Sequence, residues 1–168
     1  GLGDVYKRQS KGDASNATES ASSNLKDDGK VLNIYCWNEE FKSRITAHYP
    51  DYKEVDATHG KIGDVDVVWN ITPSDDNAYQ NNLDAALLNQ QDAPADDKID
   101  IFLVEADNAL KYVDTDYTAP VKDLGITDAD LSKQYQYTKD IVTDSKGVLK
   151  GVSWQGCPGV LFYNRDAA

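Results

Sequence analysis

Three apolar, β-prone runs, each followed by a polar corner and then by a helical stripe, dominate the pattern of this 168-residue sequence. They cover about residues 31–37, 64–72 and 98–105. Short runs rich in Val, Ile and aromatic residues, bounded by turn-forming residues, are typical of strands. Strands that alternate with helices favour a parallel sheet with helices on both faces. The sequence therefore predicts a three-layer α/β fold with a mostly parallel sheet, in which residues 31–37 form the central strand between the other two.

Apolar residues at helical spacing follow each predicted strand. Phe41, Ile45 and Tyr49 recur after the first strand, and Pro50 ends that run. The amide oxygen of Asn38 is expected to cap this helix by accepting a first-turn N–H. The second and third helices are expected to carry Tyr79, Leu83, Ala86 and Leu87, and Ala106, Ala109, Leu110 and Val113, respectively.

The remaining segments predict smaller structural features. Thr127 and Asp130 are expected to cap a further short helix, and residues 139–154 to form a hairpin that turns at 144–147. The last residues, "GVLFYNRDAA", read as a strand with a helix beginning after it.

Composition divides the chain into three parts. Residues 1–29 combine a start that has the appearance of a translated adapter with a run of small polar residues, so a non-native end and a disordered tether are expected. Residues 30–156 are expected to form the first α/β lobe. Residues 157–168 are expected to cross a hinge and begin the first strand of a second lobe, which is absent from the sequence.

Charge and motif content exclude several classes of function. The sequence has 29 acidic and 17 basic residues and a net charge of −12, which argues against nucleic acid or an anionic membrane surface as the main partner. No apolar run is long enough to span a bilayer. Cys36 and Cys157 match no zinc or redox spacing, and free thiols are expected. The sequence contains no glycine-rich phosphate loop or calcium-loop spacing, so we expect no cofactor and no metal.

Polar and aromatic residues gather at the corners that follow the predicted strands. Ligands of open α/β sheets bind outside the carboxyl ends of the strands, where these corners lie. The acids and amides at the corners are also what helix caps and first turns require, and a tryptophan there is also compatible with packing under a loop. An indole beside carboxylates suits a sugar, because the ring stacks on C–H groups while the acids accept hydroxyl hydrogens. The corners contain Trp37 to Glu40, Ser74 to Asn77, and Glu105 to Asp107.

The stretch "GVLKGVSWQGCPGVLFYNRDAA" resembles the crossover of extracellular solute-binding proteins that feed ABC importers, especially the carbohydrate-binding branch. Residues 147–152 correspond to the family's hairpin, and residues 163–166 to the strand end at which the chain enters the second lobe. The resemblance covers roughly residues 30–168 and includes "LNIYCWNEEF". Ser153 and Trp154 stand where many members carry a proline–aromatic pair.

The resemblance implies that the chain is the N-terminal part of a protein that binds a small solute, a mono- or oligosaccharide, for ABC-type import. It implies permease subunits of an ABC transporter as partners. It also implies that the protein is located on the outer face of a bacterial membrane or in the periplasm. An N-terminal lipid anchor would be its only contact with the membrane. Carried over by position, the ligand-binding residues would be Trp37, Asn38, Glu39, Glu40, Asp76, Asn77, Glu105, Asp107, Trp154 and Gln155. Tyr35, Trp69 and Tyr163 are expected in the core or in strand packing.

Two other functions are weighed against solute binding. A glycosidase would use Glu39 or Glu40 with Glu105, and it requires two carboxylates that face each other across the substrate. His48, on a helix, and His59, in a glycine-flanked loop, are expected at the surface with no nucleophile beside them. An acidic adhesion or interaction module with no small ligand is the other alternative. Amino acid, peptide and polyamine ligands stay open beside sugars.

Overall fold

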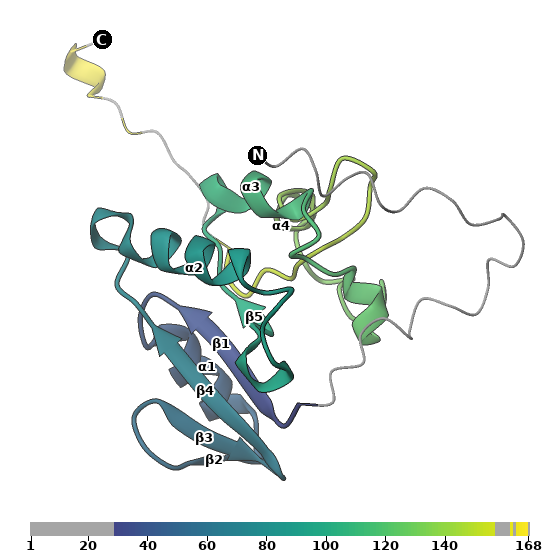
Figure 1. The fold of residues 1–168 in the computed structure, drawn as a ribbon. Coiled ribbons are helices and arrows are strands. Elements are labelled where there is room, and N and C mark those ends of the chain that lie inside the picture. The colour runs from purple at the N-terminus through teal and green to yellow at the C-terminus, as the bar shows by residue number, and fades with distance from the viewer. Residues whose placement is uncertain (1–28, 157–161, 163, 168) are drawn as a thin grey trace, which may run out of the picture.

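A five-stranded mixed sheet with parallel strands in the middle forms the centre of the molecule. The computed structural model describes residues 29–156, 162 and 164–167. The strands are β1 (Val31–Cys36), β2 (Tyr52–Glu54), β3 (His59–Ile62), β4 (Val65–Ile71) and β5 (Ile101–Phe102). They lie in the order β2-β3-β4-β1-β5 (Figure 1). Strand β1 pairs in parallel with β4 on one side and β5 on the other, which confirms the predicted central strand and its two neighbours.

The prediction of a mostly parallel sheet was wrong, because the hairpin formed by β2 and β3 was missed. Strand β2 pairs antiparallel with β3, and β3 pairs antiparallel with β4. His59, which was expected in a loop, is the first residue of β3. Strand β2 lies at the sheet edge, and its two exposed residues, Lys53 and Glu54, are charged, as is common for an edge strand. Strand β5 is also shorter than predicted and includes only Ile101 and Phe102.

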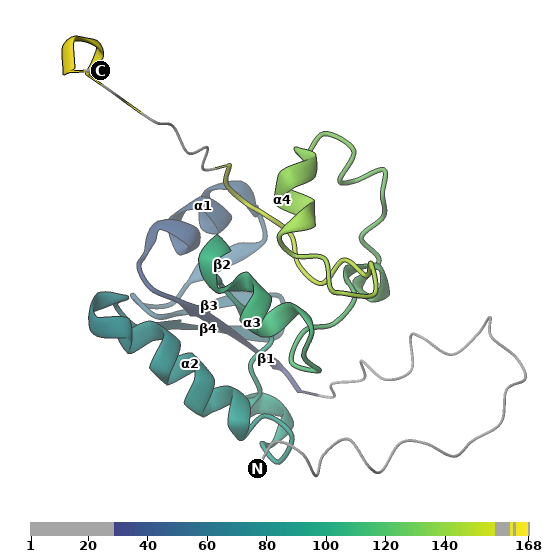
Figure 2. The same ribbon diagram turned by 90° about the horizontal axis from the view of Figure 1, so that it is seen from above.

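Helices cover both faces of the sheet and give the fold three layers. The α-helices are α1 (Glu40–His48), α2 (Ala78–Leu88), α3 (Ala109–Val113) and α4 (Gln136–Asp140). Helix α1 lies on one face and α2 on the opposite face (Figure 2). Short 3₁₀ turns occur at Asp75–Asn77, Ala95–Asp97, Ala106–Asn108, Val121–Leu124 and Arg165–Ala167.

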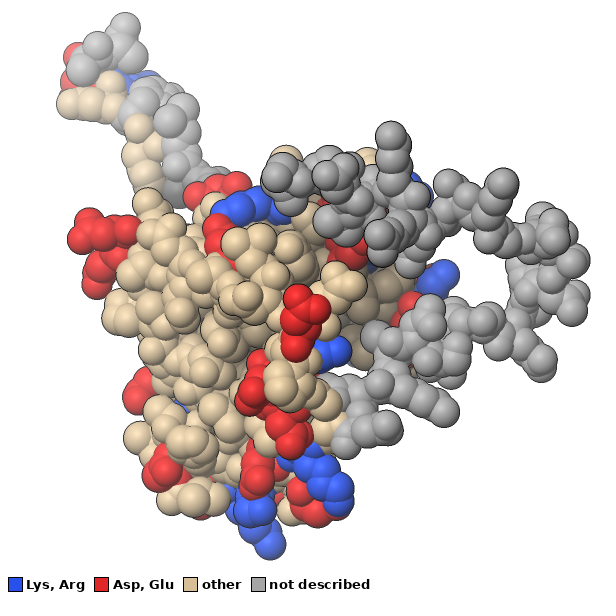
Figure 3. Space-filling model, viewed as in Figure 1, with Lys and Arg blue, Asp and Glu red and all other residues tan. Residues whose placement is uncertain are grey.

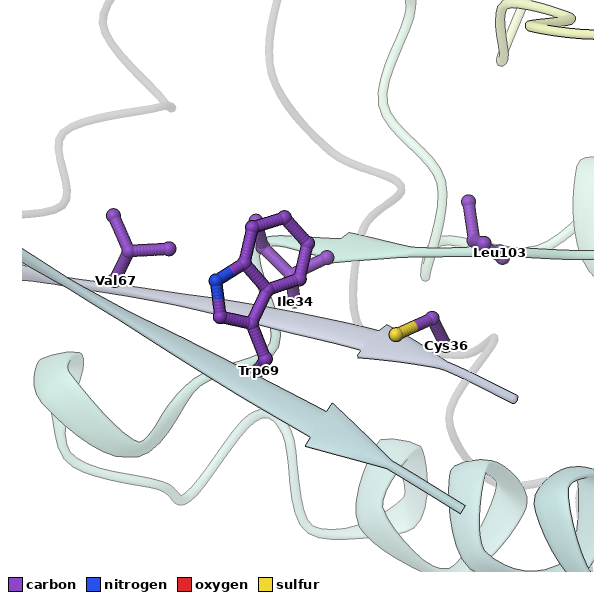
Figure 4. Packing of buried hydrophobic residues seen from close by; sticks show 5 residues of the cluster. All are labelled: Ile34, Cys36, Val67, Trp69 and Leu103. Carbon is purple, nitrogen blue, oxygen red and sulfur yellow. The ribbon is translucent and has the colours of Figure 1, made fainter. Parts of the chain in front are cut away.

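Each face of the sheet has its own hydrophobic cluster, because successive side chains of a strand point to opposite faces. Ile34 and Cys36 of β1 point to one face of the sheet (Figure 4), and Phe41 of α1 packs against their cluster. They pack there with Val67, Trp69 and Leu103. The α2 face carries a second cluster, made of Tyr79, Leu83, Leu87, Ile99 and Tyr112. The stripe predicted for the second helix therefore packs on the sheet as expected.

Local predictions at the helix ends were confirmed in part. The Asn38 amide oxygen accepts the backbone N–H of Glu40 at 2.9 Å, although α1 begins at Glu40 and not directly after Asn38. Leu110 was expected on the packed side of the third helix, but it is 74% exposed. The hydroxyl and N–H of Thr127 both bond the Asp130 carboxylate, but they form a turn and not the short helix that was predicted.

The predicted hairpin in the last third of the chain is reduced to its turn. Asp144 and Val148 are joined by a backbone hydrogen bond of 2.9 Å, and Gly147 has φ +80°, which a glycine adopts without strain. One antiparallel bridge joins Thr143 to Leu149, and α4 takes the start of the expected first strand. The tether predicted for the N-terminus and most of the final strand lie outside the described residues.

Candidate functional site

The ends of β1, β4 and β5 and the residues that follow them form one side of the molecule, which we call the carboxyl edge. Tyr79, in the first turn of α2, ties this edge together. Its hydroxyl donates to the carbonyl of Leu103 at 2.6 Å and lies 3.1 Å from the carbonyl of Tyr35. Burial of the phenol raises the pKa of Tyr79. These hydrogen bonds therefore hold the start of α2 across the ends of β1 and β5.

Residues 151–156 bring a distant part of the chain to the first corner. The Trp154 ring packs edge-on against Phe41 of α1, with 5.3 Å between the ring centroids. The side-chain amide of Gln155 donates to the Glu40 carboxylate at 3.2 Å. Gln155, predicted from the segment before the hinge, thus meets Glu40, predicted from the first corner, whereas Trp154 meets Phe41. Helix α1 and residues 151–156 are in direct contact.

An open groove lies along this contact, and we call it the α1 groove. Its volume is about 450 Å³. Arg44 reaches toward Glu40, with 3.8 Å between the guanidinium and the carboxylate. The groove is lined by Glu40, Phe41, Arg44, Ile45, His48, Trp154 and Gln155. Sequence reasoning did not select the residues from Phe41 to His48 as ligand contacts, although their spacing on one helix face was visible in the sequence.

Trp37 is less exposed than a tryptophan whose ring face is open to a ligand. Its indole is half-buried and packs edge-on against Tyr79, with ring centroids 5.4 Å apart. It also contacts the hydrophobic clusters on both faces of the sheet. Trp37 therefore supports the corner from within, while the side chains of Asn38 and Glu40 are exposed beside it.

Asp76, Asn77, Glu105 and Asp107 lie at the second and third corners of the carboxyl edge. Asp76 and Asn77 are exposed just before α2, and both have left-handed backbone conformations, with φ of 51° and 60°. Asp107 accepts a hydrogen bond from Asn108 at 3.3 Å. No hydrogen bond or ion pair within the described residues joins the side chain of Glu39 or Glu105 to another predicted site residue. The structure thus brings Asn38, Glu40, Trp154 and Gln155 together, with Trp37 and Glu39 in the same corner. It leaves Asp76, Asn77, Glu105 and Asp107 spread along the edge.

The chemistry available at this edge is that of hydrogen bonding and ring stacking. Within the described residues, no group of three or more His, Cys, Asp or Glu side chains is arranged to hold a metal ion. Cys36 is free and fully buried, and burial raises the pKa of its thiol to about 11, so it offers no nucleophile to the groove. Acidic side chains are spread over the face of the described residues in Figure 3, which is unfavourable for an anionic polymer.

No helix in the part of the chain that the structure describes is long and apolar enough to cross a bilayer. Comparisons of the chain with protein-family models, with curated protein sequences and with solved structures gave no match.

Proposed function

We propose that this chain forms one lobe of an extracellular solute-binding protein for ABC-type import, with a sugar bound at the carboxyl edge. The single observation that carries the proposal is the contact of residues 151–156 with the first corner. Through Phe41 and Glu40, this contact places Trp154 and Gln155 against α1. An aromatic ring, an amide and a carboxylate then border one open groove. These are the groups that a sugar requires.

The proposed roles follow from the chemistry of each side chain. The Glu40 carboxylate accepts hydrogen bonds from two sugar hydroxyls in place of Gln155, and Gln155 offers both a donor and an acceptor. Trp154 stacks on the C–H face of the ring. The residues along the rest of the edge contact the ligand from the side opposite α1. The proposal includes a second lobe, which would close over this edge and exclude water.

Calorimetry with a panel of neutral mono- and oligosaccharides tests this proposal. It is applied to this chain and to the product of the complete reading frame. Glu40→Gln keeps the shape of the side chain and removes its charge, so affinity is expected to fall at least about tenfold, because hydrogen bonds to charged groups are the stronger ones. Asp92→Asn, an exposed carboxylate beyond the far end of α2, is the matched control and should leave affinity unchanged.

Two outcomes contradict the proposal. One is the absence of heat with every sugar for both proteins, together with capture of a protein partner, which is the result expected of an adhesion module. The other is hydrolysis of a chromogenic glycoside that Glu39→Gln or Glu105→Gln abolishes, which is the result expected of a glycosidase.

A further inference from the structure

Two exposed tyrosines form a stacked pair that the proposed site does not yet use. The rings of Tyr135 and Tyr137 are nearly parallel, at 17°, with centroids 5.9 Å apart. Their residues are 71% and 43% exposed. Neither hydroxyl bonds another group within the described residues. The pair is therefore an ordered aromatic surface that faces solvent and that packing within the described chain does not explain.

The tyrosine pair adjoins the segment that carries Trp154 and Gln155. The side-chain amide of Gln134 donates to the Ser153 carbonyl at 2.8 Å, and the Ser153 hydroxyl donates to the Thr138 carbonyl at 3.0 Å. A β-carbon added to Gly156 would lie 3.1 Å from the Tyr137 hydroxyl. Residues 153–156 thus border the α1 groove and also contact the segment that carries the tyrosine pair.

We propose that the tyrosine pair is a second stacking surface of the same site and that the ligand is an oligosaccharide. This inference rests on the proposed function. The α1 groove, at about 450 Å³, lies in the lower part of the range for small-ligand sites, so a longer sugar chain must extend beyond it. The next flat aromatic surface along residues 153–156 is Tyr137 with Tyr135. There, the C–H face of a further sugar unit stacks on a ring.

The local arrangement favours a neutral sugar over a charged group. The two residues that flank Tyr135 are Gln134 and Gln136, which carry no charge. Their side-chain amides donate to the Ser153 carbonyl and to the Asp140 carboxylate, respectively. Because the two rings already stack on each other, binding orders few additional side-chain rotations, which keeps the entropic cost of stacking low. A charged partner would find no opposite charge among these four residues, from Gln134 to Tyr137.

Calorimetry with a length series tests the inference in the product of the complete reading frame. The probes are linear glucose oligomers of one to six units, in α-1,4 and β-1,4 linkage, and the matching mannose series. Affinity is expected to rise with chain length. Tyr135→Ala and Tyr137→Ala should weaken binding of the longest oligomer about tenfold and leave the shortest bound ligand unchanged. Tyr135→Phe should retain the gain with length, and Tyr117→Ala, at a tyrosine that is 40% exposed, is the matched control.

The possible failures are distinguishable. Binding that Glu40→Gln weakens, with no dependence on chain length or on either tyrosine, overturns this inference and leaves the proposed function standing. If Tyr135→Ala keeps full affinity for every oligomer but lowers stimulation of a reconstituted transporter, the pair is a protein contact and the inference is wrong. If no sugar of any length binds, the proposed function fails and this inference fails with it.

Discussion

The side-chain amide of Gln155 donates a hydrogen bond to the carboxylate of Glu40, although 115 residues separate the two in the sequence. Their neighbours Trp154 and Phe41 pack ring edge to ring face in the same contact. The corner after β1 is therefore completed by residues from the opposite end of the described chain. Helix α1 and residues 151–156 therefore form one structural unit at this corner.

Removal of the Trp154 ring should lower the stability of the fold as well as alter the groove. Trp154→Ala removes the contact with Phe41 and exposes part of the cluster on the α1 face. Because Trp154 is only half-buried, the free energy of unfolding should fall by about 2 kcal/mol, which is below the range for a fully buried tryptophan. Urea unfolding measures this. Leu110→Ala, at a 74% exposed position, is the control and should change stability by less than about 0.5 kcal/mol. Equal losses in the two variants would contradict the contact.

Gln90 replaces a missing strand neighbour for Ile99. The amide of Gln90 accepts the Ile99 backbone N–H at 2.9 Å and donates to the Ile99 carbonyl at 2.8 Å. Gln90→Ala should therefore cost about 1–3 kcal/mol of unfolding free energy, because two half-buried backbone groups lose their partner. The adjacent Gln91→Ala, at an exposed side chain, should cost almost nothing. The comparison is made by urea unfolding, and a loss of similar size for both variants would be the contrary result.

Gly60 is required by the ring of Tyr52, which lies across it. A β-carbon at residue 60 would overlap the phenol of Tyr52, whose hydroxyl accepts a hydrogen bond from the Trp69 indole at 3.1 Å. Gly60→Ala should therefore destabilise the protein by about 1–3 kcal/mol, as overpacking commonly does. In a Tyr52→Ala background, where the space is free, the same change should cost clearly less. Thermal unfolding of the four proteins measures this coupling, and strictly additive losses would show that the ring is not the obstacle.

The Asp114 carboxylate should give the protein a pH-dependent contribution to stability in acid. It accepts hydrogen bonds from the backbone N–H and the hydroxyl of Ser145, at 2.8 and 2.7 Å, and these hold its pKa below the usual range. A lowered pKa in the folded state stabilises the protein at pH values above the unfolded-state pKa of about 3.9. That contribution is lost as the pH falls below about 4 and through the folded pKa.

The test is the change in urea midpoint between pH 6 and pH 3. Asp114→Asn should show a smaller fall than the unmodified chain, because its carboxylate no longer titrates. Asp116→Asn, at an exposed residue that makes no side-chain hydrogen bond in the described structure, should follow the unmodified chain. An unchanged pH response in Asp114→Asn would show that Asp114 does not contribute to the pH dependence of stability.

The sequence predicts the parallel centre of the sheet well, because β1 and β4 are rich in the Val, Ile and aromatic residues that are typical of strands. It does not predict the hairpin of β2 and β3. Lys53, Glu54 and Lys61 resemble a loop in composition. They become strands only because β2 pairs with β3 and β3 pairs with β4. Gly60 favours a loop when only the sequence is considered, but in the structure it allows the close approach of the Tyr52 ring.

The candidate site is predictable to the extent that it follows from topology. Residues after the strands were placed at the carboxyl edge because parallel strands end together there. The contacts that define the α1 groove depend on residues more than a hundred positions apart, which no local pattern encodes. The same is true of Tyr137, because its position beside Gly156 is a property of tertiary packing.

Cys36 makes the central strand accessible to a chemical measurement of motion. Its thiol is completely enclosed between the sheet and α1, and its pKa of about 11 keeps it protonated at neutral pH. A thiol reagent can modify it only in molecules in which α1 has moved away and the sulfur has met solvent. In a Cys157→Ser background, the rate of modification therefore counts these opening events. A sugar that binds across α1 and residues 151–156 would slow that rate. Modification of the buried Cys36 thiol would then report whether the α1 groove is occupied.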